Sequence, residues 1–128
     1  MRILILDDEA VSLTRMTKLL SHWGVCDTAI NGNQAVTLFR KAFNDGSPYD
    51  IVTIDIEIPD GNGLDVLKEL HDMEDELGMD GWHSKKLVIT AQSNLKNLQK
   101  AAQCNCDAFL VKPVKMKVLE EKMIQIWR

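Results

Sequence analysis

The sequence has no apolar run long enough to cross a bilayer, because its longest uninterrupted apolar stretches, such as residues 3–6, contain only four residues. A membrane-spanning helix needs about 20 consecutive apolar residues. Asp7, Asp8 and Glu9 end the first apolar run before it reaches the length of a signal-peptide core. These absences predict a cytoplasmic protein that is made without a cleaved leader and does not enter a membrane.

Cysteine is also scarce, with three residues in a chain of 128. An odd number in a chain of this size argues against a disulfide framework and favours reduced thiols. Cys104 and Cys106 are close in sequence, but no second Cys/His pair follows at the spacing of a metal site. His22, His71 and His83 are scattered singly, so we expect them to be ordinary helix and strand residues.

Basic side chains are outnumbered, which gives a net charge of −4 and disfavours binding to the phosphate backbone of nucleic acids. The charge is unevenly distributed. Residues 1–83 hold 6 basic and 16 acidic side chains (net −10), and residues 84–128 hold 9 basic and 3 acidic (net +6). The asymmetry indicates either charges scattered over a solvated surface or an ion-handling site in the first part and a differently charged face in the second.

Short apolar runs alternate with longer stretches that have helical periodicity. Asn31 and Asn94 are positioned to cap the second and fourth helices. Pro113 suits the first turn of the fifth helix. The expected strands are residues 3–6, 25–30, 51–54, 87–89 and 109–111, with 25–30 at an edge, and the expected helices are 11–23, 34–43, 64–77, 94–103 and 114–127.

Five successive strand–helix units predict an α/β fold with a parallel sheet, because a crossover helix is what joins two parallel strands. The near-continuous apolar runs are typical of strands that are buried on both faces. Five strands rather than eight favour an open, doubly wound sheet over a closed barrel. In such sheets the functional site lies beyond the carboxyl ends of the strands.

Charged and hydroxyl side chains follow four of these strands. Asp7 and Asp8 come after the first strand, Asp55 ends the third, Thr90 ends the fourth, and Lys112 follows the fifth. Each residue alone could be a loop former, a β-former or a solvated charge. Their coincidence at one edge of a sheet is far more specific than any one of them.

The chemistry of this residue set points to phosphoryl transfer. Neighbouring carboxylates repel one another, and a hard divalent cation such as Mg²⁺ relieves that repulsion. One carboxylate can act as a nucleophile towards a phosphoryl group. A metal ion on one side, and an ammonium and a hydroxyl on the other, stabilise the charge that develops during the transfer.

The sequence resembles the receiver domains of two-component response regulators, in particular the single-domain CheY-like kind. The resemblance rests on the acidic run at residues 7–9, on Asp55 followed at fixed spacing by Pro59 and Gly63, on Thr90-Ala91, and on residues 107–113. It implies a flavodoxin-like, doubly wound sheet of five parallel strands in the order 2-1-3-4-5, with five helices. It also implies one receiver domain over residues 1–128 with no output domain.

The resemblance further implies that Asp55 accepts a phosphoryl group from a phosphohistidine, with Mg²⁺ as the cofactor. Asp8 and Asp55 would bind the metal directly, Asp7 would act through a water, and the backbone carbonyl of Glu57 would be the third protein ligand. The domain would be a regulatory phosphoacceptor, with self-phosphorylation and autodephosphorylation as its only reactions.

The remaining site residues are expected to form a switch. Thr90 would hydrogen-bond the phosphoryl oxygen, Lys112 would pair with it, and Phe109 would turn inward when Thr90 moves. This is a packing element with two arrangements, biased by a local change of charge.

The implied partners are a histidine kinase or a phosphotransfer protein, and an output protein. The output protein would bind through the fourth expected helix (94–103), the fifth expected strand (109–111) and the fifth expected helix (114–127). No direct contact with nucleic acid is expected, and the chain would be a monomer or a phosphorylation-dependent dimer. An acidic partner surface would suit the lysines of this face, which are Lys96, Lys100, Lys115, Lys117 and Lys122.

Other functions stay open at this point. One is a phosphorelay intermediate, and another is a small Mg²⁺-dependent aspartyl phosphatase that uses Asp55 and Glu57 as its acid pair. A flavodoxin of the same fold is excluded, because the acidic run at residues 7–9 would repel the phosphate of FMN. The interval 72–85 is longer than is typical of the family and is expected to be an extended third helix and loop, or a docking patch.

Overall fold

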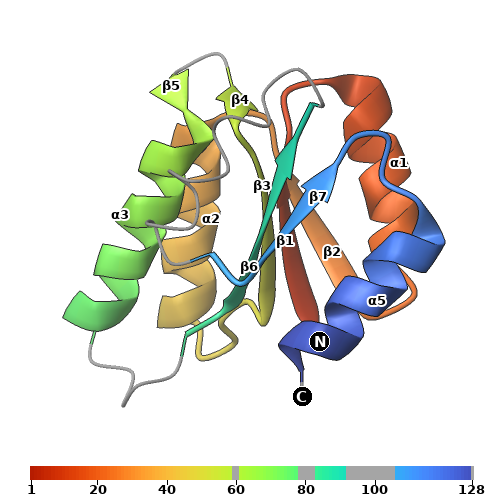
Figure 1. The fold of residues 1–128 in the computed structure, drawn as a ribbon. Helices are drawn as coiled ribbons and strands as arrows, with labels where there is room; N and C mark the ends of the chain where they lie inside the picture. Colours follow the sequence, from red (N-terminus) through yellow and green to blue (C-terminus); the bar gives the residue numbers. More distant parts are fainter. Residues whose placement is uncertain (59–60, 78–82, 92–105, 128) are drawn as a thin grey trace.

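A five-stranded parallel sheet forms the middle layer of the molecule (Figure 1). The computed structural model describes residues 1–58, 61–77, 83–91 and 106–127. The strands lie in the order β2-β1-β3-β6-β7, which confirms the predicted order 2-1-3-4-5 because β4 and β5 form a separate pair. The five strands are β1 (Arg2–Leu6), β2 (Val25–Ala29), β3 (Ile51–Asp55), β6 (Lys85–Thr90) and β7 (Ala108–Val111).

Helices cover both faces of this sheet, with α1 and α5 on one face and α2 and α3 on the other (Figure 1). Side chains alternate along β1, so Leu4 and Leu6 pack on the α2–α3 side while Ile3 and Ile5 pack on the α1–α5 side. The doubly wound prediction is therefore confirmed. The described helices are α1 (Ala10–Leu20), α2 (Gly32–Asn44), α3 (Gly63–Glu76) and α5 (Met116–Ile126).

The predicted cap of the second helix is confirmed, because the Asn31 side chain accepts a hydrogen bond from Gln34 N at 2.8 Å. The predicted fourth helix, residues 94–103, and its cap Asn94 lie outside the described residues. In the part of the chain that the structure describes, no helix is long and apolar enough to span a membrane.

The fifth helix, predicted over residues 114–127 with Pro113 at its start, begins two residues later, because α5 starts at Met116 after the extended residue Lys115. Val114 gives the reason. Its side chain is buried in the core, and its carbonyl accepts two hydrogen bonds from the Arg15 guanidinium at 2.8 and 3.2 Å. The chain is therefore held against α1 before it can turn into a helix.

A short antiparallel pair, β4 (Glu57–Ile58) with β5 (Gly61–Asn62), follows β3 and was not predicted. Asn62 then caps α3, because its side chain accepts a hydrogen bond from Leu64 N at 2.8 Å. This pair ends the sheet strand sharply and starts α3 directly beside the carboxyl end of β3.

A buried ion pair joins α3 to the amino end of β6, and nothing in the sequence pattern indicated it. The side chains of Lys86 and Glu74 are 2% and 1% exposed, and Lys86 Nζ contacts Glu74 Oε1. Glu74 Oε2 accepts a hydrogen bond from Ser84 N at 2.6 Å, and Lys86 Nζ also donates to Ser84 O at 3.1 Å. Each buried charge is thereby paired and hydrogen-bonded.

We expect Lys86→Met to lower the free energy of unfolding by about 3 kcal/mol or more, because it leaves the Glu74 carboxylate buried without its counter-charge. The exposed Lys117→Met in α5 is the control and should change stability by no more than about 0.5 kcal/mol. Urea unfolding of the three proteins measures the difference. Equal stability of Lys86→Met and wild type would contradict a charged, buried pair.

Candidate functional site

The carboxyl ends of four strands bring the predicted site residues to one edge of the sheet (Figure 1). Asp7 follows β1, Asp55 ends β3, Thr90 ends β6, and Lys112 follows β7. The four strands are consecutive neighbours in the sheet. Side chains that are far apart in the sequence therefore meet above the same edge.

Asp7, Asp8 and Asp55 form an acidic cluster at this edge. Each offers one carboxylate oxygen, and these oxygens lie within 4.8 Å of one another. Asp7 and Asp55 are 1% and 4% exposed, whereas Asp8 is exposed. Carboxylates that are so close and so poorly hydrated repel one another, so the cluster requires a counter-charge.

The Lys112 ammonium supplies that counter-charge. Lys112 Nζ donates a hydrogen bond to Asp55 Oδ2 at 3.0 Å and lies 3.2 Å from Asp7 Oδ2. The second contact is an ion pair without hydrogen-bond geometry. The backbone N–H of Lys112 donates to Thr90 O at 2.9 Å, which fixes the base of the side chain beside the end of β6.

The turn after β3 holds Asp55 in place. The backbone N–H of Glu57 donates to Asp55 Oδ1 at 3.1 Å, so the carboxylate has a partner on each oxygen. Gly63 N donates to Ile56 O at 2.7 Å. A Cβ at position 63 would lie 2.1 Å from the Asp55 carbonyl oxygen, so the first residue of α3 has to be glycine for the helix to come this close.

Burial raises the pKa of Asp55 from 3.8 to about 6, with a smaller contribution from the negative charge of Asp7. The Lys112 ammonium and the Glu57 N–H oppose this effect and lower the pKa only in part. Burial alone would lower the pKa of Lys112, but its hydrogen bond to Asp55 and the charges of Asp55 and Asp7 outweigh burial and raise it. Near neutral pH the two groups are therefore mainly an ion pair.

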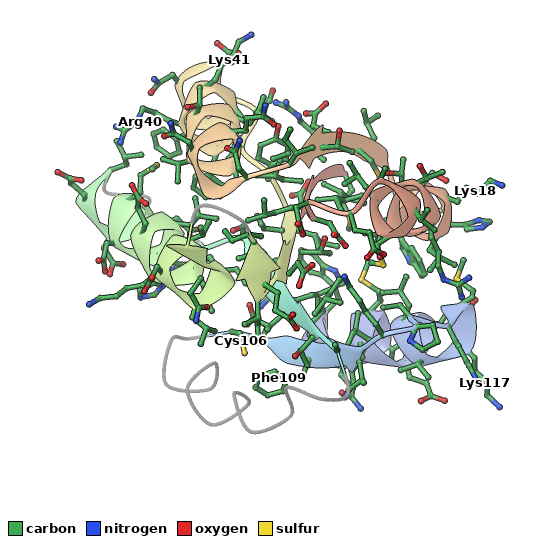
Figure 2. All side chains as sticks on the ribbon, turned by 90° about the horizontal axis from the view of Figure 1, so that it is seen from above. Lys18, Arg40, Lys41, Cys106, Phe109 and Lys117 are labelled. Atoms are coloured by element: carbon green, nitrogen blue, oxygen red, sulfur yellow. The ribbon has the colours of Figure 1, made fainter. Side chains whose placement is uncertain are left out.

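Thr90 and Phe109 lie on the same face of the sheet. Val88 is the register partner of Phe109, and strand alternation places Thr90 on the same face as Val88. Thr90 is completely buried, and its Oγ1 donates to Ala91 O at 3.2 Å. Phe109 is only partly buried and packs against the core on the α2–α3 side. Figure 2 looks along the sheet from above and shows Phe109 on the β7 side.

The donor set of the acidic cluster fits a hard divalent cation, because every donor is a carboxylate oxygen. Asp7 Oδ2 is buried and lies 3.2 Å from Lys112 Nζ, but it accepts no hydrogen bond from a described residue, so its negative charge is only partly compensated. The cluster holds Asp7, Asp8 and Asp55 but not the Glu57 carboxylate, whose residue is exposed in β4.

Two of the three histidines, which are far apart in the sequence, lie side by side in the fold. The rings of His71 and His83 stack with centroids 4.9 Å apart. His71 lies in α3 and His83 lies before β6, so only the folded chain brings them together. A sequence signal was present in the spacing of His71 and Asp75, which are i and i+4 on one helix.

Comparison with known families finds a match to the response regulator receiver domain over residues 3–124. The chemotaxis protein CheY-3 of Vibrio cholerae is 30% identical over 129 residues, which cover 99% of this chain and 92% of that protein. Probable histidine kinase 2 of Oryza sativa is 27% identical over 131 residues, which cover 94% of this chain. The chain spans only 12% of the length of that kinase.

Solved structures give the same result. A receiver domain from Clostridium thermocellum has a TM-score of 0.81 at 25% identity, with 98% of this chain and 92% of that chain covered. A CheY-like receiver domain from Methylobacillus flagellatus has a TM-score of 0.76 at 28% identity, with 98% and 97% covered.

We expect the pH dependence of stability to report the buried Asp55 carboxyl in metal-free buffer. Its pKa is higher in the folded chain than in the unfolded chain, so its contribution to stability is full below pH about 4 and is lost as pH rises through about 6. Asp55→Asn cannot ionise. As the pH rises from about 4 to about 7, the free energy of unfolding of the variant should therefore increase relative to that of wild type by on the order of 2 kcal/mol.

Urea unfolding at a series of pH values measures this gain, and the surface change Asp45→Asn serves as the control. A constant difference between Asp55→Asn and wild type over the whole range would contradict the raised pKa of Asp55.

Proposed function

The chain belongs to the response regulator receiver domain family, and from this premise we propose that Asp55 accepts a phosphoryl group from a phosphohistidine on a partner protein. The observation that carries the proposal is the contact of 3.0 Å between Asp55 Oδ2 and Lys112 Nζ inside the acidic cluster. The Asp55 carboxylate, the Lys112 ammonium and two further carboxylates lie close together there, which supports the proposal.

The chemical step uses the Asp55 carboxylate as the nucleophile. One of its oxygens forms a bond to phosphorus while the N–P bond of the donor breaks, and the electron pair of that bond stays on the imidazole, which takes up a proton. The product is an acyl phosphate. With a pKa of about 6, Asp55 is mostly ionised at neutral pH and can attack.

Asp7, Asp8 and Asp55 would hold Mg²⁺, and the backbone carbonyl of Glu57 would complete the protein ligands. A bound Mg²⁺ supplies positive charge that screens the carboxylates from the incoming phosphoryl oxygens. Two observations support this assignment, namely the all-oxygen donor set and the buried Asp7 Oδ2 that accepts no hydrogen bond from a described residue.

Lys112 and Thr90 would bind the new phosphoryl group. The Lys112 ammonium already contacts Asp55, and its side chain is 25% exposed, so it can shift towards an added group. Among the described residues, the hydroxyl of Thr90 donates to the carbonyl of its neighbour Ala91, and it can exchange that contact for a phosphoryl oxygen. Phe109, on the same face of the sheet, would repack as Thr90 moves.

We further propose that residues 1–128 act as one receiver unit and signal through β7, α5 and the segment of the predicted fourth helix. A histidine kinase or phosphotransfer protein would be the phosphodonor. The segment of the predicted fourth helix lies outside the described residues. In the described part of this surface Lys115, Lys117 and Lys122 are basic, which suits an acidic partner surface.

We expect a small-molecule phosphodonor with Mg²⁺ to add one phosphoryl group to the wild-type chain and none to Asp55→Asn. Intact-mass measurement reads the addition directly. Asp45→Asn, which changes an exposed aspartate, is the control and should be labelled like wild type. Equal labelling of wild type and Asp55→Asn would contradict the assignment of Asp55 as the phosphoryl acceptor.

We expect Lys112→Ala to accept the phosphoryl group but to lose most of the conformational response, because the added charge no longer has a cation to attract. The aromatic ring signals of Phe109 can be followed by NMR when beryllofluoride and Mg²⁺ are added, since the chain has only three phenylalanines. Wild type and the exposed Lys115→Ala should both shift. A full shift of Phe109 in Lys112→Ala would contradict the coupling.

A further inference from the structure

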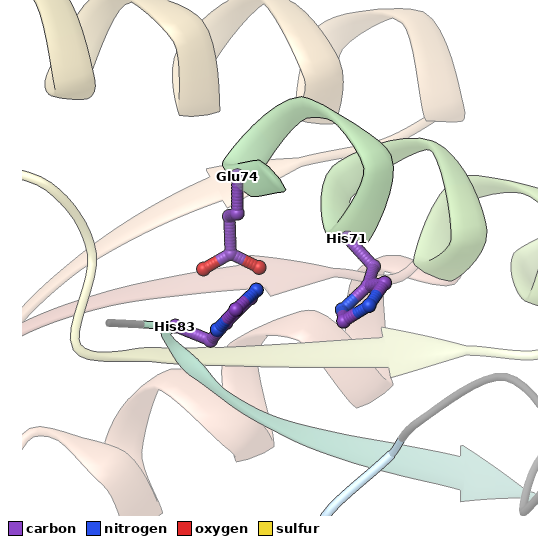
Figure 3. A group of neighbouring side chains, drawn as sticks. All are labelled: His71, Glu74 and His83. Carbon is purple, nitrogen blue, oxygen red and sulfur yellow. The ribbon is translucent and has the colours of Figure 1, made fainter. Parts of the chain in front are cut away.

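A second group of possible metal ligands lies at the opposite end of α3 from Asp55. The last turns of α3 carry His71, Glu74 and Asp75. His83 lies two residues before the start of β6. Figure 3 shows the side chains of His71, Glu74 and His83 pointing toward one another across the gap between the helix and the strand. One ligand atom from each of these three lies within 4.8 Å of the others.

Asp75 links the two imidazoles. His83 Nε2 is 2.9 Å from Asp75 Oδ1, and His71 Nε2 is 3.5 Å from Asp75 Oδ2. The two rings are stacked at 4.9 Å with an interplanar angle of 19°. Each imidazole thus has its Nε2 beside a different oxygen of the Asp75 carboxylate. Two imidazoles and a carboxylate are a donor set that suits a borderline metal ion.

Glu74 acts as the anchor of the group rather than as its main ligand. Its two oxygens are engaged by Lys86 Nζ and by Ser84 N, and the ammonium at Glu74 Oε1 would repel a second cation there. The same contacts bind the residue next to His83 to α3. The backbone on both sides of the imidazole pair is therefore held in position before any ion arrives.

The remaining three side chains are accessible to solvent. The side chains of His71, His83 and Asp75 are 25%, 32% and 59% exposed, so an ion can reach them and water can complete its coordination. Rotation about two side-chain bonds turns each imidazole from its stacked position towards a shared ion. Nitrogen donors also separate this group from the acidic cluster at the other end of the sheet, which offers only oxygens.

We propose that His71, His83 and Asp75 bind one late first-row divalent ion, with Zn²⁺ as the ion that fits best, and with water in the fourth position. The bound ion would connect the end of α3 to the residues before β6. This site is independent of phosphoryl transfer and of Mg²⁺.

The experiment is a calorimetric Zn²⁺ titration of the full chain with Mg²⁺ in excess, so that the acidic cluster is occupied. Wild type should bind one Zn²⁺ per chain at this site. His71→Gln and His83→Gln should each weaken binding by at least about tenfold, because each removes a ligand. His22→Gln, which changes an exposed histidine elsewhere, is the matched control and should bind like wild type.

NMR of the histidine ring protons gives a second measurement that needs no variant to fold. In wild type the signals of His71 and His83 should shift or broaden together at the first equivalent of Zn²⁺, while those of His22 stay in place. Unchanged His71 and His83 signals would overturn the proposal. So would Zn²⁺ affinities that are the same in wild type, His71→Gln and His83→Gln.

Discussion

The contact of Lys112 with Asp55 and Asp7 is the interaction on which the site depends. Two buried carboxylates cannot share one edge of a sheet without a nearby cation, because burial and mutual repulsion both disfavour their ionised forms. The cation comes from the residue after the last strand, so the order β1-β3-β6-β7 is what closes the site. The pKa of Asp55 is still raised to about 6, so the Lys112 ammonium offsets the effect of burial only in part.

The protein places a lysine–carboxylate pair at each end of β6, and the surroundings give the two pairs different properties. The Lys86 and Glu74 side chains are almost fully buried, and Ser84 N donates a hydrogen bond to the second carboxylate oxygen. That pair is therefore a fixed structural link between α3 and the sheet. The Lys112 side chain is 25% exposed and shared between two carboxylates. Only the second pair can rearrange when a new charge arrives, since its cation has room to move.

Local patterns in the sequence were enough to predict the parallel sheet and the residues at the carboxyl ends of its strands. Four of the five strands contain a short apolar run, and Asp7, Asp55, Thr90 and Lys112 are found where those runs end. The pairing of Glu74 with Lys86 could not be predicted, because it depends on how α3 lies against β6 rather than on any spacing. The stacking of His71 and His83 could not be predicted for the same reason. The fifth helix begins later than predicted, because hydrogen bonds from Arg15 in α1 hold the backbone at Val114.

On the proposed function, the energetic logic of the switch follows from what Lys112 contacts now. Phosphorylation replaces one carboxylate charge with a phosphoryl group that carries more negative charge and lies farther from the strand. Lys112 would not neutralise Asp7 and that group equally, so on this proposal its position and that of its backbone partner Thr90 would change together. Among the described residues, Thr90 would give up a hydrogen bond to its own neighbour, Ala91, so the movement would cost little free energy. The face of the sheet shared with Phe109 would then carry the change from the site to the β7 edge.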